Sequence, residues 1–282
     1  MGSERWGVRA SDGHELELVV HAPAEPKAVL MFVCALGVEA RYYAPFGEEL
    51  AERGIALAMC DLRGNGTSSL RPSRGVDFGY REIVELDIPA ALDVVRECMP
   101  NVPLFVGGHS LGGQLMMLHL AAVRPEVAGT VLVACAIPYY RNWEGNPRRY
   151  IRFATLVFPV AGALLGYVPA KRLGFGGTTE ARTLMRDWSH NARTARYEPK
   201  GSHVDYEPAL REVELDFLTV SIDTDAMAPP NAVEFAFQKL PKSRGERVHA
   251  HLSTRHPAAH MRWARDPREV VEAVATWVET RL

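Results

Sequence analysis

Short apolar runs alternate with stretches of helical periodicity along most of the chain, and each kind of pattern predicts a different element. Seven runs have the length and composition of strands, at residues 15–22, 28–33, 55–60, 103–108, 129–135, 216–222 and 246–252. Five stretches repeat apolar residues at helical spacing, at residues 42–53, 83–98, 111–123, 231–240 and 267–280. Many of the strands are apolar throughout, which favours burial on both faces. We therefore expect a mostly parallel twisted sheet with helices on both faces, which is the α/β class.

The alternation of strands and helices breaks between residues 137 and 210. This interval is too long for a simple connection between a strand and a helix. It also contains Trp143, Phe153, Phe158 and Trp188 together with several helical stretches. We therefore expect a helical cap, inserted over the sheet at 137–210, and a core domain formed by 1–136 and 211–282.

Composition and charge narrow the class of protein. The chain has 282 residues, of which 47% are hydrophobic and 23% charged, and its formal net charge is −2. These values are typical of a globular protein and give no reason to expect nucleic acid as a partner. The charge is uneven, because residues 139–200 hold 11 Lys or Arg against 4 Asp or Glu. A basic face on the expected cap would attract a phosphorylated ligand.

The cysteines and the apolar segments bear on the location of the protein. Widely spaced thiols predict small buried side chains rather than a disulfide framework or a metal site, and the four are Cys34, Cys60, Cys98 and Cys135. The N-terminus lacks the basic start and apolar stretch of a signal peptide. The apolar segment 153–169 is too short for a membrane span and is interrupted by Pro159. We expect a cytoplasmic protein without stable membrane insertion.

The strongest chemical signal is the sequence Gly108-His109-Ser110-Leu111-Gly112, at the junction between a predicted strand and a predicted helix. A G-x-S-x-G sequence in this context is typical of a nucleophile elbow, a tight turn that lifts the serine hydroxyl above the strand ends. The Leu111 N–H at the start of the helix can then face an oxyanion. The alternative interpretation is that Ser110 only caps the helix.

A serine hydroxyl needs a base to become a nucleophile, and the base needs an acid that orients it. After the strand at 216–222 the chain offers Asp223 and Asp225, and before the last helix it offers His256 and His260. Each choice gives the chain order Ser, Asp, His that is expected for an elbow of this kind. Two further histidines, His249 and His251, share one face of the last strand and are predicted to be structural or to face solvent.

The segment 42–69, the sequence GGHSLGG and the two terminal segments together resemble the α/β-hydrolase superfamily over essentially the whole core. Within it the chain looks closest to a poorly characterised bacterial branch of serine hydrolases, whose cap contains segments similar to GYVPAKRLGFG and MRDWSHNARTARY. The resemblance implies an α/β-hydrolase fold. It favours Asp225 as the acid, because the family places a proline four residues after its catalytic aspartate, as Pro229 stands here. It favours His260 as the base, because that residue lies seven positions before Pro267.

The resemblance also implies an oxyanion hole with two backbone donors. One is the Leu111 N–H, and the other is the Leu36 N–H in the loop after the strand at 28–33. Many members of the family have His-Gly at this place, whereas this chain has Cys34-Ala35-Leu36-Gly37.

These features predict a serine hydrolase that cleaves a carboxylic ester through an acyl-enzyme. Its catalytic residues would be Ser110, Asp225 and His260, with no cofactor and no metal, and its partner a small, apolar acyl substrate. Two alternatives stay open. The basic cap favours a thioesterase or acyltransferase that acts on a coenzyme A-linked or carrier-linked acyl group, and the fold alone is compatible with a non-catalytic ligand-binding protein.

Overall fold

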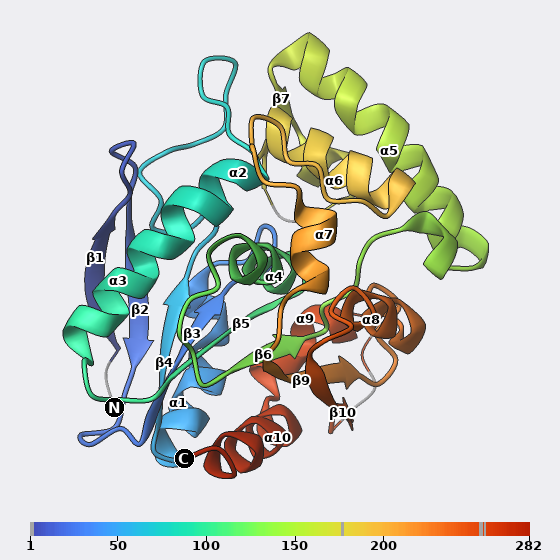
Figure 1. The fold of residues 1–282 in the computed structure, drawn as a ribbon. Coiled ribbons are helices and arrows are strands. Elements are labelled where there is room, and N and C mark those ends of the chain that lie inside the picture. The colour runs from blue at the N-terminus through green and yellow to red at the C-terminus, as the bar shows by residue number, and fades with distance from the viewer. Residues whose placement is uncertain (1–2, 176–177, 254–255, 257) are drawn as a thin grey trace.

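The computed structural model of the chain describes residues 3–175, 178–253, 256 and 258–282. Its centre is an eight-stranded sheet in the order β1-β2-β4-β3-β5-β6-β9-β10 (Figure 1). These strands are β1 Glu4–Arg9, β2 Glu15–His21, β3 Ala28–Val33, β4 Ile55–Cys60, β5 Leu104–His109, β6 Gly129–Val133, β9 Asp216–Ile222 and β10 Arg244–Ala250. The pairs β1/β2 and β2/β4 are antiparallel, and the other neighbours are parallel. The prediction of a mostly parallel sheet is therefore confirmed.

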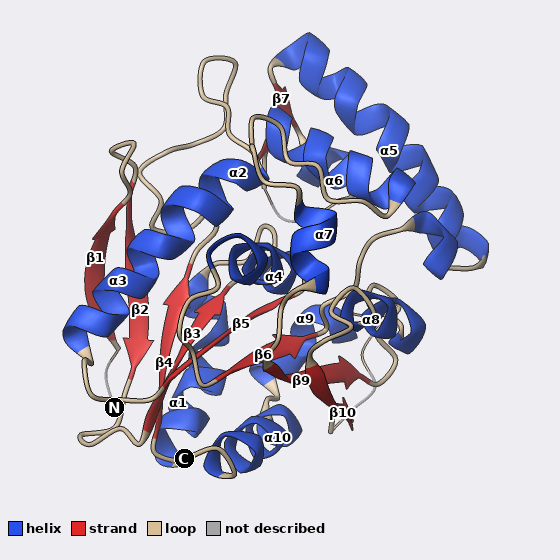
Figure 2. Ribbon diagram, in the orientation of Figure 1, coloured by secondary structure: helices blue, strands red, loops and turns tan. Residues whose placement is uncertain are grey.

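Helices on both faces explain why the central strands are apolar throughout. Every residue of β3, β4 and β6 is buried. Figure 2 shows α3 and α4 on one side of the sheet and α1 and α10 on the other. The bounds of the helices around the sheet are α1 Ala44–Glu52, α3 Ile88–Cys98, α4 Leu111–Val123, α8 Pro230–Phe237 and α10 Arg268–Glu279. A strand that is covered on both faces has no solvent side, so it needs no polar alternation.

The register of the parallel strands brings several loops to one edge of the sheet. Val33 of β3 pairs with Gly108 of β5, and Val133 of β6 pairs with Val220 of β9. The residues that follow these strands therefore leave the sheet at a common level, and Ser110 is among them. In open α/β sheets this carboxyl edge is where ligands bind.

Residues 137–210, which we call the inserted segment, lie between β6 and β9. Helix α5, Gly145–Leu165, runs along α6, Arg182–Thr194, at the outer side of the molecule (Figure 1). Two short strands, β7 Tyr167–Val168 and β8 Glu180–Ala181, pair antiparallel beside them. Helix α7, Tyr206–Arg211, packs against α4. The boundary expected at residue 210 thus falls inside α7, a helix that contacts the core.

Short helical elements complete the described chain. They are η1 Ala40–Tyr43, α2 Tyr80–Glu82, the π-helix η2 Ile83–Asp87, η3 Tyr140–Asn142, η4 Ala170–Leu173, α9 Ala259–Arg262 and η5 Trp263–Arg265. The π-helix breaks the helix expected at 83–98. Because Pro89 has no N–H to continue the ordinary hydrogen-bond pattern, the widened turn before it is bonded from the Ile88 N–H to the Ile83 carbonyl.

Two other expectations differ from the structure at exposed positions. The sequence does not predict β1, an edge strand in which Val8 is the one buried residue, because such a strand lacks apolar alternation. The last strand lies at Arg244–Ala250 rather than at 246–252, since it too is an edge strand that is mostly open to solvent. Cys98 is exposed, so the expectation of a buried thiol is wrong there, although it is confirmed for the other three cysteines.

Candidate active site

Ser110 occupies a sharp turn between β5 and α4. Its backbone has φ 53° and ψ −120°, a left-handed conformation that is rare for a residue other than glycine. Two glycines make this turn possible. A Cβ on Gly112 would lie 2.2 Å from the Val33 carbonyl oxygen, and one on Gly108 would lie 2.5 Å from the backbone of Gly112. The sequence pattern G-x-S-x-G therefore reflects a real lack of space.

The structure brings Ser110, His260 and Asp225 together. His260 Nε2 lies 2.9 Å from Ser110 Oγ, and His260 Nδ1 lies 2.7 Å from Asp225 Oδ2. His260 and Asp225 are both buried. Because a carboxylate can only accept, the Nδ1 atom of His260 carries a proton and donates it to Asp225. The Nε2 atom is then an acceptor for the Ser110 hydroxyl, which is the arrangement that a general base needs.

Asp225 is held in place by the backbone of its own loop. Its second oxygen, Oδ1, accepts the Met227 N–H at 2.8 Å and the Ala228 N–H at 3.0 Å. The hydrogen bond from His260 thus adds to two from the backbone, and together they fix the position of both carboxyl oxygens. The carboxylate is oriented before any substrate binds.

The other candidates for the acid and the base, Asp223 and His256, make their contacts away from Ser110. Asp223 lies beside His249 and His251, at 3.8 Å from a ring nitrogen of each, and His256 accepts the Ala258 N–H in a turn of its own loop. One ligand atom each from Asp223, His249 and His251 lies within 4.8 Å of the others, so this group is one that could hold a metal ion. The sequence spacing did not indicate it, because Asp223 directly follows β9, whereas His249 lies in β10 and His251 directly follows that strand.

Leu36 and Leu111 line the same pocket as Ser110. Leu111 is the first residue of α4, so its N–H has no acceptor within the helix. The preceding N–H in the other loop, that of Ala35, donates to Tyr43 Oη at 3.1 Å. Across the residues that the structure describes, the Leu36 N–H has no hydrogen-bond acceptor. Both groups are therefore available to a ligand oxygen near Ser110.

Three further residues lie next to the site, and they are His109, Trp263 and Tyr43. The Trp263 Nε1–H donates to His109 Nε2 at 3.3 Å, and His109 Nδ1 lies 2.8 Å from Tyr43 Oη. Because Nε2 accepts, Nδ1 carries the proton and donates to Tyr43. Burial lowers the pKa of His109 well below its usual value, so the ring is neutral. This neutral ring packs against that of His260, with 4.7 Å between centroids.

The position of His109 inside G-x-S-x-G was the one sequence clue to this group. Through Trp263, its hydrogen bonds link the elbow to the turn that follows the helix of His260. Through Tyr43 and Ala35, they link it to the loop that carries Leu36. This series of hydrogen bonds therefore connects the elbow with the segment after His260 and with the Leu36 loop.

The pocket over Ser110 has a volume of about 480 Å³ and mostly apolar walls. The core contributes Ser110, His260 and the loop at Leu36, and the inserted segment contributes most of the remaining wall. Those wall residues are Pro138, Trp143, Tyr150, Ile151, Gly174, Phe175 and Trp188. A pocket with these walls suits an apolar ligand.

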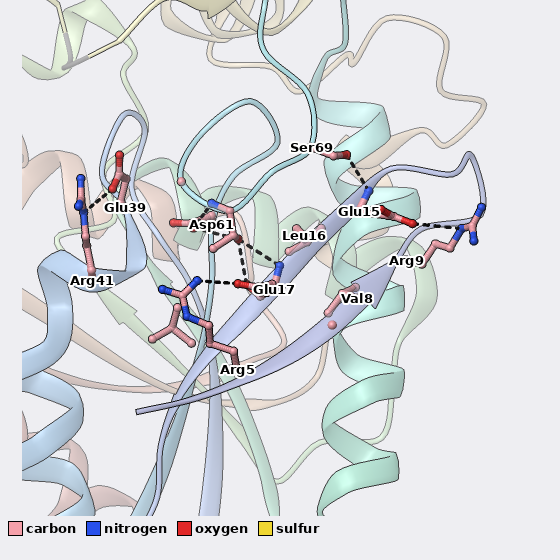
Figure 3. A pocket seen from close by; sticks show the side chains of 14 residues that line it. Arg5, Val8, Arg9, Glu15, Leu16, Glu17, Glu39, Arg41, Asp61 and Ser69 are labelled. Atoms are coloured by element: carbon pink, nitrogen blue, oxygen red, sulfur yellow. Dashed lines mark hydrogen bonds and ion pairs between the residues drawn. The ribbon is translucent and has the colours of Figure 1, made fainter. Parts of the chain in front are cut away.

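A larger pocket of about 730 Å³ lies against β1 and β2 (Figure 3), and Ser110, Asp225 and His260 are not among the residues that line it. Its charged side chains pair with one another, as Arg5 does with Glu17 and Arg41 with Glu39. Asp61 at its base accepts the N–H groups of Ala40 and Thr67 and so holds two loops. Although this pocket is larger, the charged groups named here are engaged within the protein, so we do not assign the reactive site to it.

Known proteins resemble the chain at the level of family and fold. Residues 24–198 match the model of a family described as serine aminopeptidase, S33. The chain is 29% identical over 125 residues to a Schizosaccharomyces pombe protein named "Putative monoglyceride lipase", a match that covers 43% of this chain and 32% of that protein. The aligned part thus spans about a third of this curated relative.

Two solved structures share the fold across nearly the whole chain. A soluble variant of monoglyceride lipase from Saccharomyces cerevisiae, in complex with a substrate analogue, has a TM-score of 0.75 and 14% identity and covers 100% of this chain and 96% of that one. Est1E from Butyrivibrio proteoclasticus, with ferulic acid bound, has a TM-score of 0.68 and 17% identity and covers 98% of each chain. At such low identity these likenesses show the fold alone.

Proposed function

Because the chain belongs to the serine aminopeptidase S33 family of α/β-hydrolases, we propose that it is a serine hydrolase that cleaves a carboxylic ester. The observation that carries the proposal is the continuous hydrogen-bond chain from Ser110 through His260 to Asp225. The three residues lie on different loops at one edge of the sheet. The hydrogen bonds run from Ser110 to His260 and from His260 to Asp225, which is the order of a nucleophile, a base and an orienting acid.

The reaction follows from these contacts. Ser110 Oγ attacks the ester carbonyl carbon while His260 Nε2 takes the hydroxyl proton, and Asp225 stabilises the imidazolium that forms. The carbonyl oxygen becomes an oxyanion and accepts the Leu36 and Leu111 N–H groups. Collapse of the intermediate breaks the bond to the alcohol oxygen, which leaves with the proton of His260. The acyl group is now an ester of Ser110. Water, deprotonated by His260, attacks this ester, and His260 returns the proton to Ser110 Oγ as the acyl group leaves as the acid.

The pocket supports an apolar acyl group as substrate. The inserted segment contributes Tyr150, Ile151, Phe175 and Trp188 to the pocket that Ser110 lines. This placement supports the division into a core, 1–136 and 211–282, and a cap, 137–210, whose side chains shape the acyl site. The curated relative is named for monoglyceride cleavage, which fits an apolar chain on a small alcohol.

Replacement of the nucleophile tests the proposal. Ser110→Ala should abolish turnover of p-nitrophenyl acyl esters, with a loss on the order of 10⁴-fold or more, and should abolish labelling by a fluorophosphonate probe. Ser221→Ala is the matched control, because Ser221 lies at the end of β9 and bonds to His249 rather than to the triad. If Ser110→Ala were still labelled at the wild-type rate, Ser110 would not be the nucleophile.

The coenzyme A or carrier hypothesis rests on basic residues of the inserted segment. Two of them are engaged within the chain, since Arg182 pairs with Asp77 and Arg186 with Asp187. Turnover of a coenzyme A thioester and of the matching oxygen ester, each at low and high salt, separates the two functions. A steep loss with salt for the thioester alone would favour the carrier hypothesis, because exposed charges are screened.

A further inference from the structure

The outer face of α5 is apolar although it is open to solvent. The exposed fractions of its side chains are 62% for Phe153, 60% for Leu156, 60% for Val160 and 70% for Leu164. These four positions follow the helical repeat, so they form one stripe that is about 16 Å long at a rise of roughly 1.5 Å per residue. The helix has no charged residue after Arg152.

The opposite face of the same helix is also apolar, because it packs into the molecule. Ile151, Ala154, Phe158 and Gly162 are buried, and the helix runs along α6. A surface helix of a globular protein normally has one apolar face toward the core and a polar face toward water. Helix α5 has apolar residues on both faces. An exposed patch of this kind marks a surface that binds something apolar.

Three arginines lie at the N-terminal end of the stripe, at Arg148, Arg149 and Arg152, and all are exposed. Within the described part of the chain none of them forms an ion pair, in contrast to Arg182 and Arg186 of α6. Arg149 precedes Phe153 by one turn and so lies on the same face as the stripe. An apolar stripe that continues into unpaired arginines matches the two layers of a phospholipid surface, acyl chains and anionic headgroups.

We propose that the outer face of α5 docks on a lipid surface with anionic headgroups. The helix lies in the plane of the interface, with the stripe from Phe153 to Leu164 among the acyl chains and the three arginines on phosphate and carboxylate groups. The contact is peripheral, because the helix lies along the interface rather than through it. Across the described residues no helix is long and apolar enough to cross a bilayer. Tyr150 and Ile151 of the same helix line the pocket over Ser110, so the docked helix also forms part of the pocket wall.

Vesicle flotation tests the docking without reference to catalysis. The full chain should float with vesicles of equal parts phosphatidylcholine and phosphatidylserine, and less with phosphatidylcholine alone. The triple variant Leu156→Gln, Val160→Gln and Leu164→Gln should lose at least about tenfold in partitioning, because each change removes apolar area from the interface. The variant Arg148→Gln, Arg149→Gln and Arg152→Gln should lose about fivefold per arginine on the anionic vesicles.

The matched control is Val123→Gln, since Val123 is a similarly exposed apolar residue at the end of α4. It should float like the wild type. All substituted positions of the stripe are exposed, so each variant should keep the wild-type unfolding temperature and the wild-type kcat/KM on a water-soluble ester. Those two readouts separate a failure of docking from a failure of folding or of the proposed hydrolase function.

Three results would overturn the proposal. One is a wild-type chain that stays with the lipid-free fraction, and another is a glutamine variant of the stripe that floats as well as the wild type. The third is a wild-type dimer in analytical ultracentrifugation that becomes a monomer in the stripe variant, because the stripe would then be covered by a second copy of the chain.

Discussion

Two aromatic clusters lie near the pocket, one in the core and one in the inserted segment, and they differ in how they are held. In the core, the rings of Phe46 and Tyr43 pack on Trp263 at 5.2 and 5.9 Å between centroids. In the inserted segment, Phe175 packs on Trp188 at 4.8 Å and on Phe158 at 5.1 Å. Ring contacts of this type contribute similarly in both places.

Polar connections set the core cluster apart. Trp263 donates to His109, and Tyr43 accepts both from His109 and from the Ala35 N–H. Hydrogen bonds are directional, so they fix the loops of the core cluster. Among the described residues of the inserted segment, no hydrogen bond joins the rings of Phe158, Phe175 and Trp188. Apolar packing constrains volume more than direction. We infer that the core cluster positions the reacting groups and that the other cluster sets the shape of the acyl site.

The largest effect that we expect is a loss of kcat when the polar contacts of the core are changed. Asp225→Asn removes the acceptor that fixes the His260 tautomer, so kcat should fall by about 10⁴-fold. Asp223→Asn is the matched control, because Asp223 lies on the same loop but contacts His249 and His251. Steady-state kinetics on a p-nitrophenyl ester measure both variants. Equal losses in the two would mean that the loop, rather than the Asp225 carboxylate, is what matters.

The choice between these two aspartates shows how far the sequence could go. Ser110 could be predicted from the residues, because the tight turn leaves no room for side chains at Gly108 and Gly112. Asp223 and Asp225 both follow a buried strand, and the residues alone do not distinguish them. The turn at Thr224, where φ is 61°, separates their surroundings, and such a backbone conformation at a threonine has no sequence signature.

The sequence also does not predict burial or exposure that depends on contacts between distant segments. In the sequence the run 153–169 is apolar and too short for a membrane span, and nothing in it indicates a helix with one face buried and one exposed. The residues facing α6 and those facing solvent are equally apolar, so the sequence pattern has no polar side to reveal. The polar link from Trp263 through His109 to Tyr43 joins three distant segments and becomes visible only in the folded chain.

The next largest effect concerns stability of the inserted segment. Glu180 in β8 is fully buried, and burial raises its pKa from an ordinary 4.5 to about 7. Its Oε2 atom has no hydrogen-bond partner among the described residues. The Glu180 carboxyl group therefore binds its proton more tightly in the folded state than in the unfolded state. Stability is therefore highest below the unfolded pKa and falls as pH rises toward the folded pKa, by on the order of 3 kcal/mol.

Asp187 of α6 acts in the same direction, because burial raises its pKa to about 6. Urea unfolding between about pH 5 and pH 8 measures the sum of the two groups. Glu180→Gln should flatten most of the decline and be more stable than the wild type at the alkaline end, whereas Glu279→Gln, an exposed control, should follow the wild type. A variant curve parallel to that of the wild type would show that Glu180 titrates normally.

The smallest effects that we expect are changes in kcat/KM when the tryptophan of each cluster is replaced. Trp188→Ala opens the pocket wall, so the kcat/KM ratio of long to short acyl esters should rise by about tenfold, while turnover of the shortest ester changes little. Trp263→Phe keeps a ring in the core but removes the N–H that His109 accepts. Loss of this hydrogen bond costs about 1 kcal/mol, so kcat/KM should fall by about fivefold for every chain length alike. A series of p-nitrophenyl esters measures both variants. The division of roles fails if Trp263→Phe changes the chain-length preference or if Trp188→Ala lowers all esters equally.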